Sequence, residues 1–112
     1  MEIKTGIDIV KISRFEKVKN NPNFLKKTFD DSEIMDKKIS SLAGIFALKE
    51  AFFKATQIKI NEWNEIIVKN HDNGKPYILF DESLIEFKIK SIDCSISHDS
   101  EYAIANVVIL SE

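Results

Sequence analysis

The sequence predicts an α+β fold in which an antiparallel sheet packs against one long central helix and several shorter helices. Two observations lead to this prediction: strand-like alternation lies near both ends of the chain, and residues 40–57 have the pattern of a single apolar helix between them. Segregation of strands from helices along a chain is typical of α+β domains. With 112 residues, the chain is expected to form a single domain over residues 1–112.

The first strand is expected over residues 3–10, and it contains an acidic residue of a type that strands usually avoid. Successive side chains point to opposite faces, which places Asp8 opposite the isoleucines and beside the space left by Gly6. A charged residue on an exposed edge strand is the simpler explanation of Asp8. The two faces consist of Ile3, Ile7 and Ile9 on one side and of Lys4, Gly6, Asp8 and Val10 on the other.

A short helix is expected over residues 13–19 and a short helix or turn over residues 24–29, with a turn between them at residues 20–23, where asparagine and proline gather. Asp30 then resembles a helix cap, and Glu33 lies three residues later, as in a capping box. We expect this third helix to end near Lys38.

The long helix is expected to begin at Ser40 or Ser41, either of which can cap its start, and to end near Gln57. Apolar residues occupy most of its turns, so most of the helix should be buried. Three charged residues interrupt it, namely Lys49, Glu50 and Lys54.

Glu50 has an unusual position on this helix. Phe46 lies about one turn before it and Phe53 nearly one turn after it. A carboxylate among aromatic rings is unfavourable unless it is paired or bound to a cation. The simpler alternative is an ion pair between Glu50 and Lys54, which are four residues apart.

The remainder of the chain is expected to be mostly strand. A strand over residues 65–69 is followed by the turn signal Asn73-Gly74 and by a return strand over residues 76–80. Residues 81–90 fit either a short helix or a strand. Strands over residues 91–98 and 102–110 follow, joined by a second hairpin.

Composition and charge limit the possible partners and location. The formal net charge of −2 gives no reason to expect a nucleic acid partner. The N-terminal residues do not resemble a signal peptide, and no apolar segment approaches the ~20 residues that span a bilayer, so no membrane partner is expected. The single cysteine, Cys94, cannot form a disulfide within the chain, which favours a reducing, cytoplasmic location.

Basic residues gather in one short segment near the N-terminus. Residues 11–27 hold six basic residues and a single acidic one, Glu16. This imbalance in an acidic chain suggests an acidic partner, although a solvated lysine-rich face is the simpler explanation. The six basic residues are Lys11, Arg14, Lys17, Lys19, Lys26 and Lys27.

Several of the unusual residues could act together. Asp8 and Glu50 lie on separate elements, and two carboxylates can share one Mg²⁺, which completes its shell with water and phosphate oxygens. Lys54 could then supply a point charge for those phosphates. The turn at Gly74 and Lys75 could bring the backbone close to a nucleotide.

Four motifs contain these residues and together resemble one known family. Their order and approximate spacing are similar to those of holo-acyl-carrier-protein synthase, the small, stand-alone type of 4′-phosphopantetheinyl transferase. The resemblance spans nearly the whole chain and implies a 4′-phosphopantetheinyl transferase-like fold. The motifs are Gly6-Ile-Asp-Ile-Val-x-Ile-x-Arg14, Phe46-x-x-Lys-Glu-Ala-x-x-Lys-Ala55, Asn73-Gly-Lys-Pro76 and Ser95-Ile-Ser-His98.

The resemblance implies an Mg²⁺-dependent enzyme that transfers 4′-phosphopantetheine from coenzyme A to a serine of apo-acyl carrier protein in fatty acid biosynthesis. The second product would be adenosine 3′,5′-bisphosphate. The implied metal ligands are Asp8 and Glu50, and the implied catalytic residues are Asp8, Glu50, Lys54 and His98. The implied coenzyme A site consists of Lys54, Gly74, Lys75, Pro76, Ser97 and His98.

The carrier protein is expected to bind around Arg14, with Lys11 and Lys17 beside it. Arg14 is the one arginine among 16 basic residues, and it lies inside the first motif. A planar guanidinium suits contact with a carboxylate. Three alternatives remain for the base that activates the serine of the carrier protein: Glu50, a metal-bound water and a group near His98.

The chain departs from the family pattern at a few positions. Ile45 stands where the family usually has an arginine that is expected to help hold the 3′-phosphate of coenzyme A, and Lys75 is a possible replacement. Gln57 and Lys59 stand where glycines often follow the helix, so this loop is expected to differ in shape. Asp99 follows His98, as in some members.

The resemblance also implies a homotrimer with each active site between two subunits. The segment 102–110 is apolar on both faces, whereas a small antiparallel sheet usually leaves one face wet. A partner subunit is therefore expected to cover the second face. The alternative is that helices of the same chain cover both faces.

Two other functions stay open at this stage. In the first, the chain transfers phosphopantetheine by the same chemistry, but to a carrier protein of secondary metabolism. The other is a non-catalytic α+β binding module, in which Glu50 and Lys54 form a structural pair.

Overall fold

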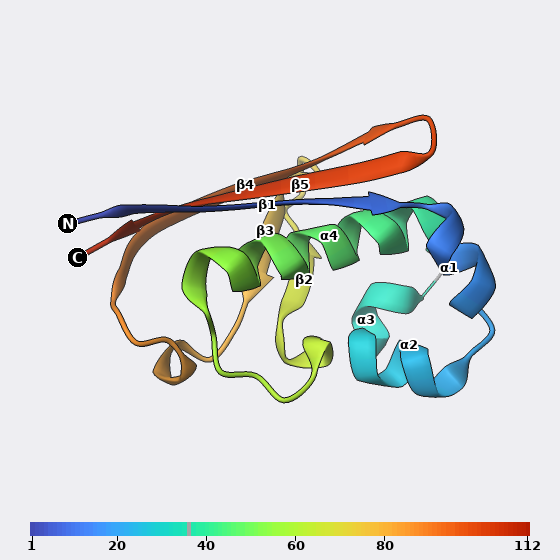
Figure 1. The fold of residues 1–112 in the computed structure, drawn as a ribbon, viewed down its shortest axis with the longest axis horizontal. Helices are drawn as coiled ribbons and strands as arrows, with labels where there is room; N and C mark the ends of the chain where they lie inside the picture. The colour runs from blue at the N-terminus through green and yellow to red at the C-terminus, as the bar shows by residue number, and fades with distance from the viewer. Residues whose placement is uncertain (36) are drawn as a thin grey trace.

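A three-stranded antiparallel sheet with one long helix on a single face dominates the computed structural model, which describes residues 1–35 and 37–112 (Figure 1). The strand order is β1-β5-β4. Helix α4 packs mainly against β1 and β5. These elements span Ile3–Lys11 (β1), Ile89–Asp99 (β4), Tyr102–Ser111 (β5) and Ile39–Thr56 (α4). The predicted α+β class with an antiparallel sheet and a long central helix is confirmed.

Three short helices lie at one end of α4, namely α1 (Ser13–Val18), α2 (Pro22–Thr28) and α3 (Asp31–Ile34) (Figure 1). The predicted capping box is present, since the Asp30 side chain accepts from the Ser32 backbone and the Glu33 side chain accepts from the Asp30 backbone. The expected helix end near Lys38 is wrong. Helix α3 ends at Ile34 because Met35 is extended, with ψ of 121°.

Helix α4 is largely buried, as predicted, but its start differs from the prediction. The helix begins at Ile39, so Ser40 and Ser41 lie inside it, and its N-cap residue Lys38 makes no side-chain capping bond. Its end matches the prediction. Gln57 takes a left-handed conformation with φ of 54°, and its N–H donates to the Phe53 carbonyl.

The predicted Asn-Gly hairpin forms a separate two-stranded sheet of β2 (Ile67–Asn70) and β3 (Pro76–Leu79). Gly74 has φ of +91°, which favours glycine in this turn. Two 3₁₀ helices complete the chain. The first, η1, spans Trp63–Glu65, and the second, η2, spans Glu82–Leu84 inside the segment whose structure was ambiguous from sequence.

The two faces of the three-stranded sheet differ in exposure. The face against α4 is buried, whereas apolar side chains of the opposite face are exposed, with Ile3 at 72% and Ile7 at 60%. No helix of the described chain covers this outer face (Figure 1), so the alternative in which helices of the same chain cover both faces is wrong. The outer apolar residues are Ile3, Ile7, Ile9, Tyr102, Ile104 and Val108, from β1 and β5.

Candidate active site

An unusually close contact between β1 and α4 brings the two predicted acids together. A Cβ added at Gly6 would lie 1.8 Å from the carbonyl oxygen of Ala51, so only glycine permits this approach. Asp8 lies two residues further along the same inner face of β1, and Glu50 directly precedes Ala51. The carboxyl groups of Asp8 and Glu50 consequently lie within hydrogen-bonding reach of each other.

The environment of Glu50 favours its protonated form. Burial, a hydrogen bond with Asp8 and the negative charge of Asp8 raise the pKa of Glu50 to about 7, against the opposing influence of Arg14 and Lys54. Two carboxylates this close repel each other unless a proton or a cation lies between them. Near neutral pH the pair is therefore ready to exchange its proton for a metal ion.

Lys54 contacts Asp8 instead of forming the i,i+4 pair with Glu50 that was the simpler expectation. Its Nζ donates to Asp8 Oδ1 at 3.1 Å and to the Ile7 carbonyl oxygen at 2.9 Å. The other Asp8 oxygen, Oδ2, is buried and accepts no hydrogen bond from an N–H or hydroxyl group of the described residues, so the proton of Glu50 is the donor available to it. When Glu50 loses that proton, a cation would take its place beside Oδ2.

An arginine and an aromatic cluster border the acids. The guanidinium carbon of Arg14, on α1, lies 6.0 Å from the centroid of the Phe46 ring. Trp63 packs edge-on against both Phe46 and Phe53, with ring centroids 5.6 and 5.8 Å away. Phe46 and Phe53 lie on α4 about one turn before and after Glu50, as the sequence predicted. The part played by Trp63 was not predicted, because nothing in the sequence places η1 beside this face of α4.

A buried ion pair next to the acids was also missed from sequence. Lys49 Nζ lies 2.7 Å from Glu33 Oε1, and both side chains are fully buried. Glu33 was predicted only as a capping-box partner, and in the structure it has both roles. The available signal was a lysine on a helix that was expected to be mostly buried.

A second group of predicted residues lines a pocket of about 260 Å³ on the opposite side of α4. Gly74, Pro76 and His98 all border it, and Ile45, the departure from the family pattern, forms part of its wall. His98 Nε2 lies 2.9 Å from the carbonyl oxygen of Ser40, which holds the ring near the start of the helix. The other lining residues are Lys37, Ser41, Val68, Asn70 and Ile96.

Two residues expected in the coenzyme A site lie elsewhere in the single chain. Lys75 Nζ is 2.9 Å from Asp93 Oδ1 and 3.2 Å from the Cys94 carbonyl oxygen, so it points away from the pocket. Ser97 lies on the outer face of β4, beside Ile104.

The two groups of site residues occupy opposite edges of the sheet. Asp8 on β1 is aligned with Ala105 on β5, which is aligned with Ile96 on β4, two residues before His98. Two strand spacings, about 10 Å, therefore separate the strand of Asp8 from that of His98, and α4 packs on the face between them (Figure 1). Within one chain, the acid pair and the pocket do not form one continuous site.

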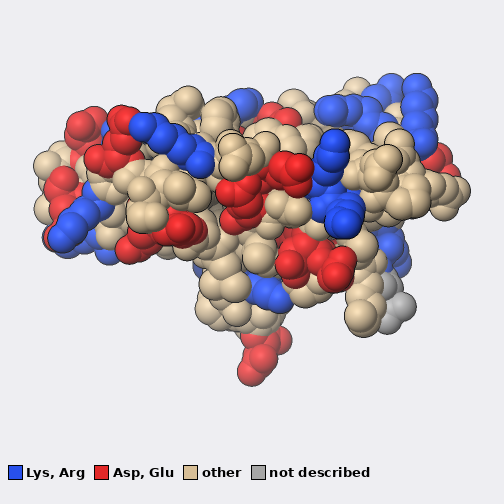
Figure 2. All heavy atoms as spheres, turned by 90° about the horizontal axis from the view of Figure 1, so that it is seen from below, with Lys and Arg blue, Asp and Glu red and all other residues tan. Residues whose placement is uncertain are grey.

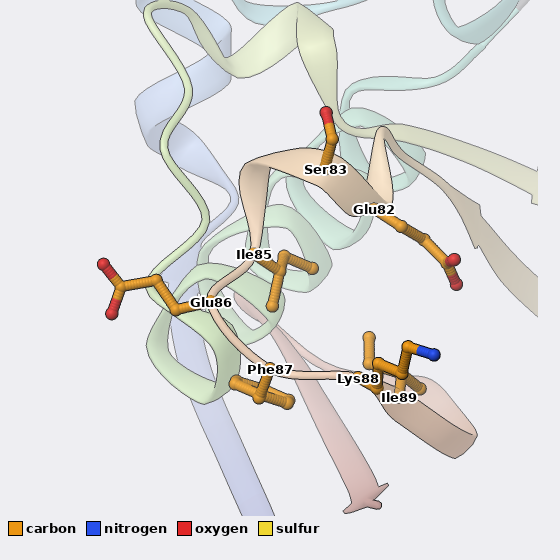
Figure 3. A pocket seen from close by; sticks show the side chains of 7 residues that line it. All are labelled: Glu82, Ser83, Ile85, Glu86, Phe87, Lys88 and Ile89. Carbon is orange, nitrogen blue, oxygen red and sulfur yellow. The ribbon is translucent and has the colours of Figure 1, made fainter.

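Another hollow of the described chain is remote from both groups. It measures about 340 Å³ and lies between η2 and β4, lined by Glu82, Ser83 and residues 85–89. Figure 3 shows Ile85 facing this hollow while Glu86 points away from it, and Glu86 forms an exposed ion pair with Lys59. None of the predicted site residues lines it.

The donor set fits a hard divalent cation. Asp8 and Glu50 offer carboxylate oxygens, and Asp8 Oδ2 is a buried acceptor to which no N–H or hydroxyl group of the described residues donates. Magnesium is commonly held by one or two carboxylates and takes its other ligands from water and phosphate. No cluster of three or more potential metal-ligating side chains occurs in residues 1–35 and 37–112, so such an ion would depend on a ligand for further oxygens.

An acid pair next to a lysine has the chemistry to hold a cation together with a phosphate-bearing ligand. The model of the 4′-phosphopantetheinyl transferase superfamily matches residues 4–107. The chain belongs to this superfamily. A holo-[acyl-carrier-protein] synthase from Finegoldia magna is 36% identical over 100% of this chain and 99% of its own length, and one from Helicobacter pylori is 44% identical over 95% and 96%.

Solved structures give the same result. A Helicobacter pylori holo-[acyl-carrier-protein] synthase in complex with coenzyme A has a TM-score of 0.84 and 39% identity, covering 95% of this chain and 99% of that one. A Bacillus anthracis holo-(acyl-carrier-protein) synthase in complex with CoA (3′,5′-ADP) has a TM-score of 0.79 and 32% identity, covering 97% of this chain and 96% of that one. The fold implied by the resemblance is confirmed.

Proposed function

We propose that this chain is a holo-acyl-carrier-protein synthase that moves 4′-phosphopantetheine from coenzyme A to a serine of apo-acyl carrier protein. The observation that carries the proposal is the Asp8–Glu50 pair, in which Glu50 has a raised pKa and Asp8 has a buried oxygen that depends on the Glu50 proton. Relatives that align over nearly the whole chain carry this name, and one solved relative holds coenzyme A and another CoA (3′,5′-ADP). The proposed client is the carrier protein of fatty acid biosynthesis, in the cytoplasm.

Asp8 and Glu50 are the proposed ligands of a magnesium ion. When bound, Mg²⁺ supplies positive charge for the pyrophosphate oxygens of coenzyme A. Lys54 already lies against Asp8 and is half-exposed, so its ammonium can turn toward a phosphate while it stays near the metal site. Its charge stabilises the departing phosphate.

The serine of the carrier protein must lose its proton as it attacks. Glu50 titrates near neutrality, which suits a general base, but a Glu50 that binds the metal is less available for that role. A water on the metal and a group near His98 are the other possibilities.

The pocket at His98 is the proposed site for the adenosine end of coenzyme A. Gly74 and Pro76 line this pocket, as expected for a turn close to a nucleotide. Ile45 leaves the pocket without the family's arginine, and Lys75 is engaged by Asp93. Lys37 borders the pocket and is the better-placed cation for the 3′-phosphate.

The proposed docking surface for the carrier protein lies at the end of β1 and on α1, where Lys11, Arg14 and Lys17 are exposed. Figure 2 shows Lys and Arg side chains gathered at the end that carries α1 and α2. Arg14 lies close enough to Glu50 to oppose its pKa rise. A carrier protein bound at Arg14 would thus bring its serine near the acids.

A homotrimer is the proposed assembly. The outer face of the sheet exposes apolar side chains from β1 and β5, and such a patch is typical of an interface. Burial of this face would contribute about 25 cal/mol per Å². Association would also explain how Asp8 and Glu50 of one subunit could meet the His98 pocket of a neighbour, although the two lie at opposite edges of one chain.

Transfer can be tested with purified protein, apo-acyl carrier protein, coenzyme A and Mg²⁺. The expected result is a carrier protein heavier by one phosphopantetheine, with adenosine 3′,5′-bisphosphate released and with no reaction in EDTA. A carrier protein that stays unmodified while the same preparation is modified by a known synthase would contradict the proposal. Parallel reactions with a secondary-metabolism carrier protein would identify the preferred client.

A further inference from the structure

A fully buried ion pair of the described chain lies next to the proposed metal site without belonging to it. The side chains of Lys49 and Glu33 are both 0% exposed, and their charged atoms are 2.7 Å apart. Lys49 directly precedes Glu50 on α4. The proposed chemistry makes no use of either residue, so their burial requires another explanation.

The ammonium of Lys49 has an acceptor for each of its three hydrogens. Nζ donates to Glu33 Oε1 at 2.7 Å, to the Thr28 carbonyl oxygen at 2.9 Å and to the Trp63 carbonyl oxygen at 3.2 Å. These acceptors come from α3, from the end of α2 and from η1. One side chain thus ties α4 to three separate segments.

Glu33 extends the same connections. Its Oε1 also accepts from the Asp30 backbone N–H at 2.8 Å, and its Oε2 accepts from the Val68 backbone N–H on β2 at 2.7 Å. The carboxylate therefore joins the cap of α3 and the hairpin sheet to α4. We refer to Lys49 and Glu33 with these contacts as the Lys49–Glu33 hub.

Stability alone explains such a hub poorly. Removing two charges from water is costly, and a buried ion pair can often be replaced by apolar side chains without loss of stability. Burial lowers the pKa of Lys49, while the charge and hydrogen bond of Glu33 oppose that change. What the hub provides is a fixed geometry, because its contacts can all form in only one orientation of the helix.

That orientation decides where Glu50 points. Consecutive residues lie about 100° apart around a helix, so Lys49 and Ala51 flank Glu50. The hub holds Lys49, and the close contact with Gly6 of β1 holds Ala51. A rotation of α4 by about 20° would move a side-chain end by ~2 Å, since side chains extend ~5–6 Å from the axis, and misplacement by 1 Å can cost about 100-fold in rate.

We propose that Lys49 is a positioning residue which, held by Glu33, fixes the rotation of α4 so that the Glu50 carboxyl faces Asp8. The proposal rests on the proposed function in one respect, namely that Asp8 and Glu50 together hold the metal. Lys49 itself touches neither substrate nor metal and acts through Glu50.

The test replaces the charged hub by a neutral one of similar shape. The double variant Lys49→Met with Glu33→Gln keeps the aliphatic stem and a carbonyl that can accept from the Val68 N–H. The matched control is Lys59→Met with Glu86→Gln, which removes an exposed ion pair outside both the proposed site and the proposed docking surface. Mg²⁺ is titrated calorimetrically into each protein saturated with coenzyme A, and the kinetic constants for transfer are measured.

The hub variant is expected to remain folded by circular dichroism, to bind Mg²⁺ about tenfold more weakly and to lose kcat, with KM for coenzyme A within about twofold. The control variant should match the wild type in all three. A purely structural role would lower only the melting temperature. A folded hub variant with wild-type Mg²⁺ affinity and kcat would overturn the proposal.

A second variant tests the proposal if the first variant does not fold. Lys49→Arg keeps the charge, but its planar guanidinium cannot donate to the three acceptors from the position of Nζ. Weaker Mg²⁺ binding and lower kcat in folded Lys49→Arg would support the proposal, and wild-type values would overturn it. If the wild type itself bound no Mg²⁺, the proposed metal site would fail, which is a result distinct from equal binding by wild type and variant.

Discussion

Helix α4 carries two lysines that each pair with an acid from another element, and the two pairs differ in completeness. Lys49 and Glu33 are both 0% exposed, and every hydrogen of the ammonium has an acceptor. Lys54 is 54% exposed, and its partner Asp8 keeps one buried oxygen whose available donor is the Glu50 proton. Lys49 and Lys54 lie five positions apart on the same helix, yet one belongs to a closed pair and the other to an open one.

This difference teaches where to look for chemistry. Buried polar groups in folded proteins are nearly always satisfied, so a carboxylate oxygen left unsatisfied when Glu50 loses its proton indicates a ligand that completes it. The closed pair has no capacity left for a ligand, and its role is confined to geometry. The open pair, with Glu50 beside it, has acceptor capacity for a cation.

The largest expected difference is in stability, between alanine substitutions of the two lysines. Lys49→Ala leaves the Glu33 charge buried and unpaired, which should cost about 3–5 kcal/mol. Lys54→Ala breaks a half-exposed pair and should cost less than about 1 kcal/mol, while it lowers the rate of transfer. Urea denaturation of both variants measures the difference, and equal losses of stability would contradict the closed-versus-open distinction.

Removal of either acid of the open site should reduce catalysis by a large factor. Asp8→Ala and Glu50→Ala are each expected to lower kcat/KM by about 100- to 1,000-fold, because the charges that organise the transition state are lost. Both variants should fold, and Glu82→Ala, in the remote η2 segment, is the control. Near-normal activity of either acid variant at low Mg²⁺ would show that the two-carboxylate site is wrong.

Much of the fold could be predicted from the sequence because it is encoded locally. Period-two alternation marked β4 and β5, the apolar run marked α4, and Asn73-Gly74 marked the hairpin. The length of α3 could not be predicted, since the extended conformation of Met35 has no local signal. Alternation also cannot say which face of β1 a helix will cover, and in the structure the isoleucines are exposed while Asp8 faces inward.

The candidate site was predictable in its residues but not in its layout. The motifs identified Asp8, Glu50 and Lys54, which the structure brings together. The hub was missed because Glu33 and Lys49 are 16 residues apart, and charged residues on a helix usually face solvent. The separation of His98 from the acids depends on strand order, which is a property of the tertiary structure.

Charge reversal on the basic surface near the open pair should change KM for only one of the two substrates. Arg14→Glu with Lys17→Glu is expected to raise KM for the carrier protein about tenfold and to weaken its salt dependence, with KM for coenzyme A unchanged. Lys90→Glu, an exposed residue near the start of β4, is the control. Equal changes in both substrate constants would indicate local unfolding instead of lost docking.

A smaller effect is expected in the pH dependence of stability without metal. The folded protein keeps the Glu50 proton up to about pH 7, whereas an unfolded glutamate loses it near 4.5. The raised pKa therefore makes stability fall as pH rises between these values. In EDTA, Glu50→Gln should melt several degrees above the wild type at pH 8 and show little of this gain at pH 4.5. A difference in melting temperature that does not change with pH would contradict the raised pKa.

The most direct test of the account concerns the two edges of the sheet, which carry the acids and the His98 pocket separately. Glu50→Ala damages one edge and His98→Ala damages the other, so each protein alone should be inactive or nearly so. If neighbouring subunits join the edges, mixing the two variants under conditions that exchange subunits should restore a measurable fraction of transfer activity. No recovery on mixing, together with a monomeric mass by light scattering for fully active wild-type protein, would contradict the account.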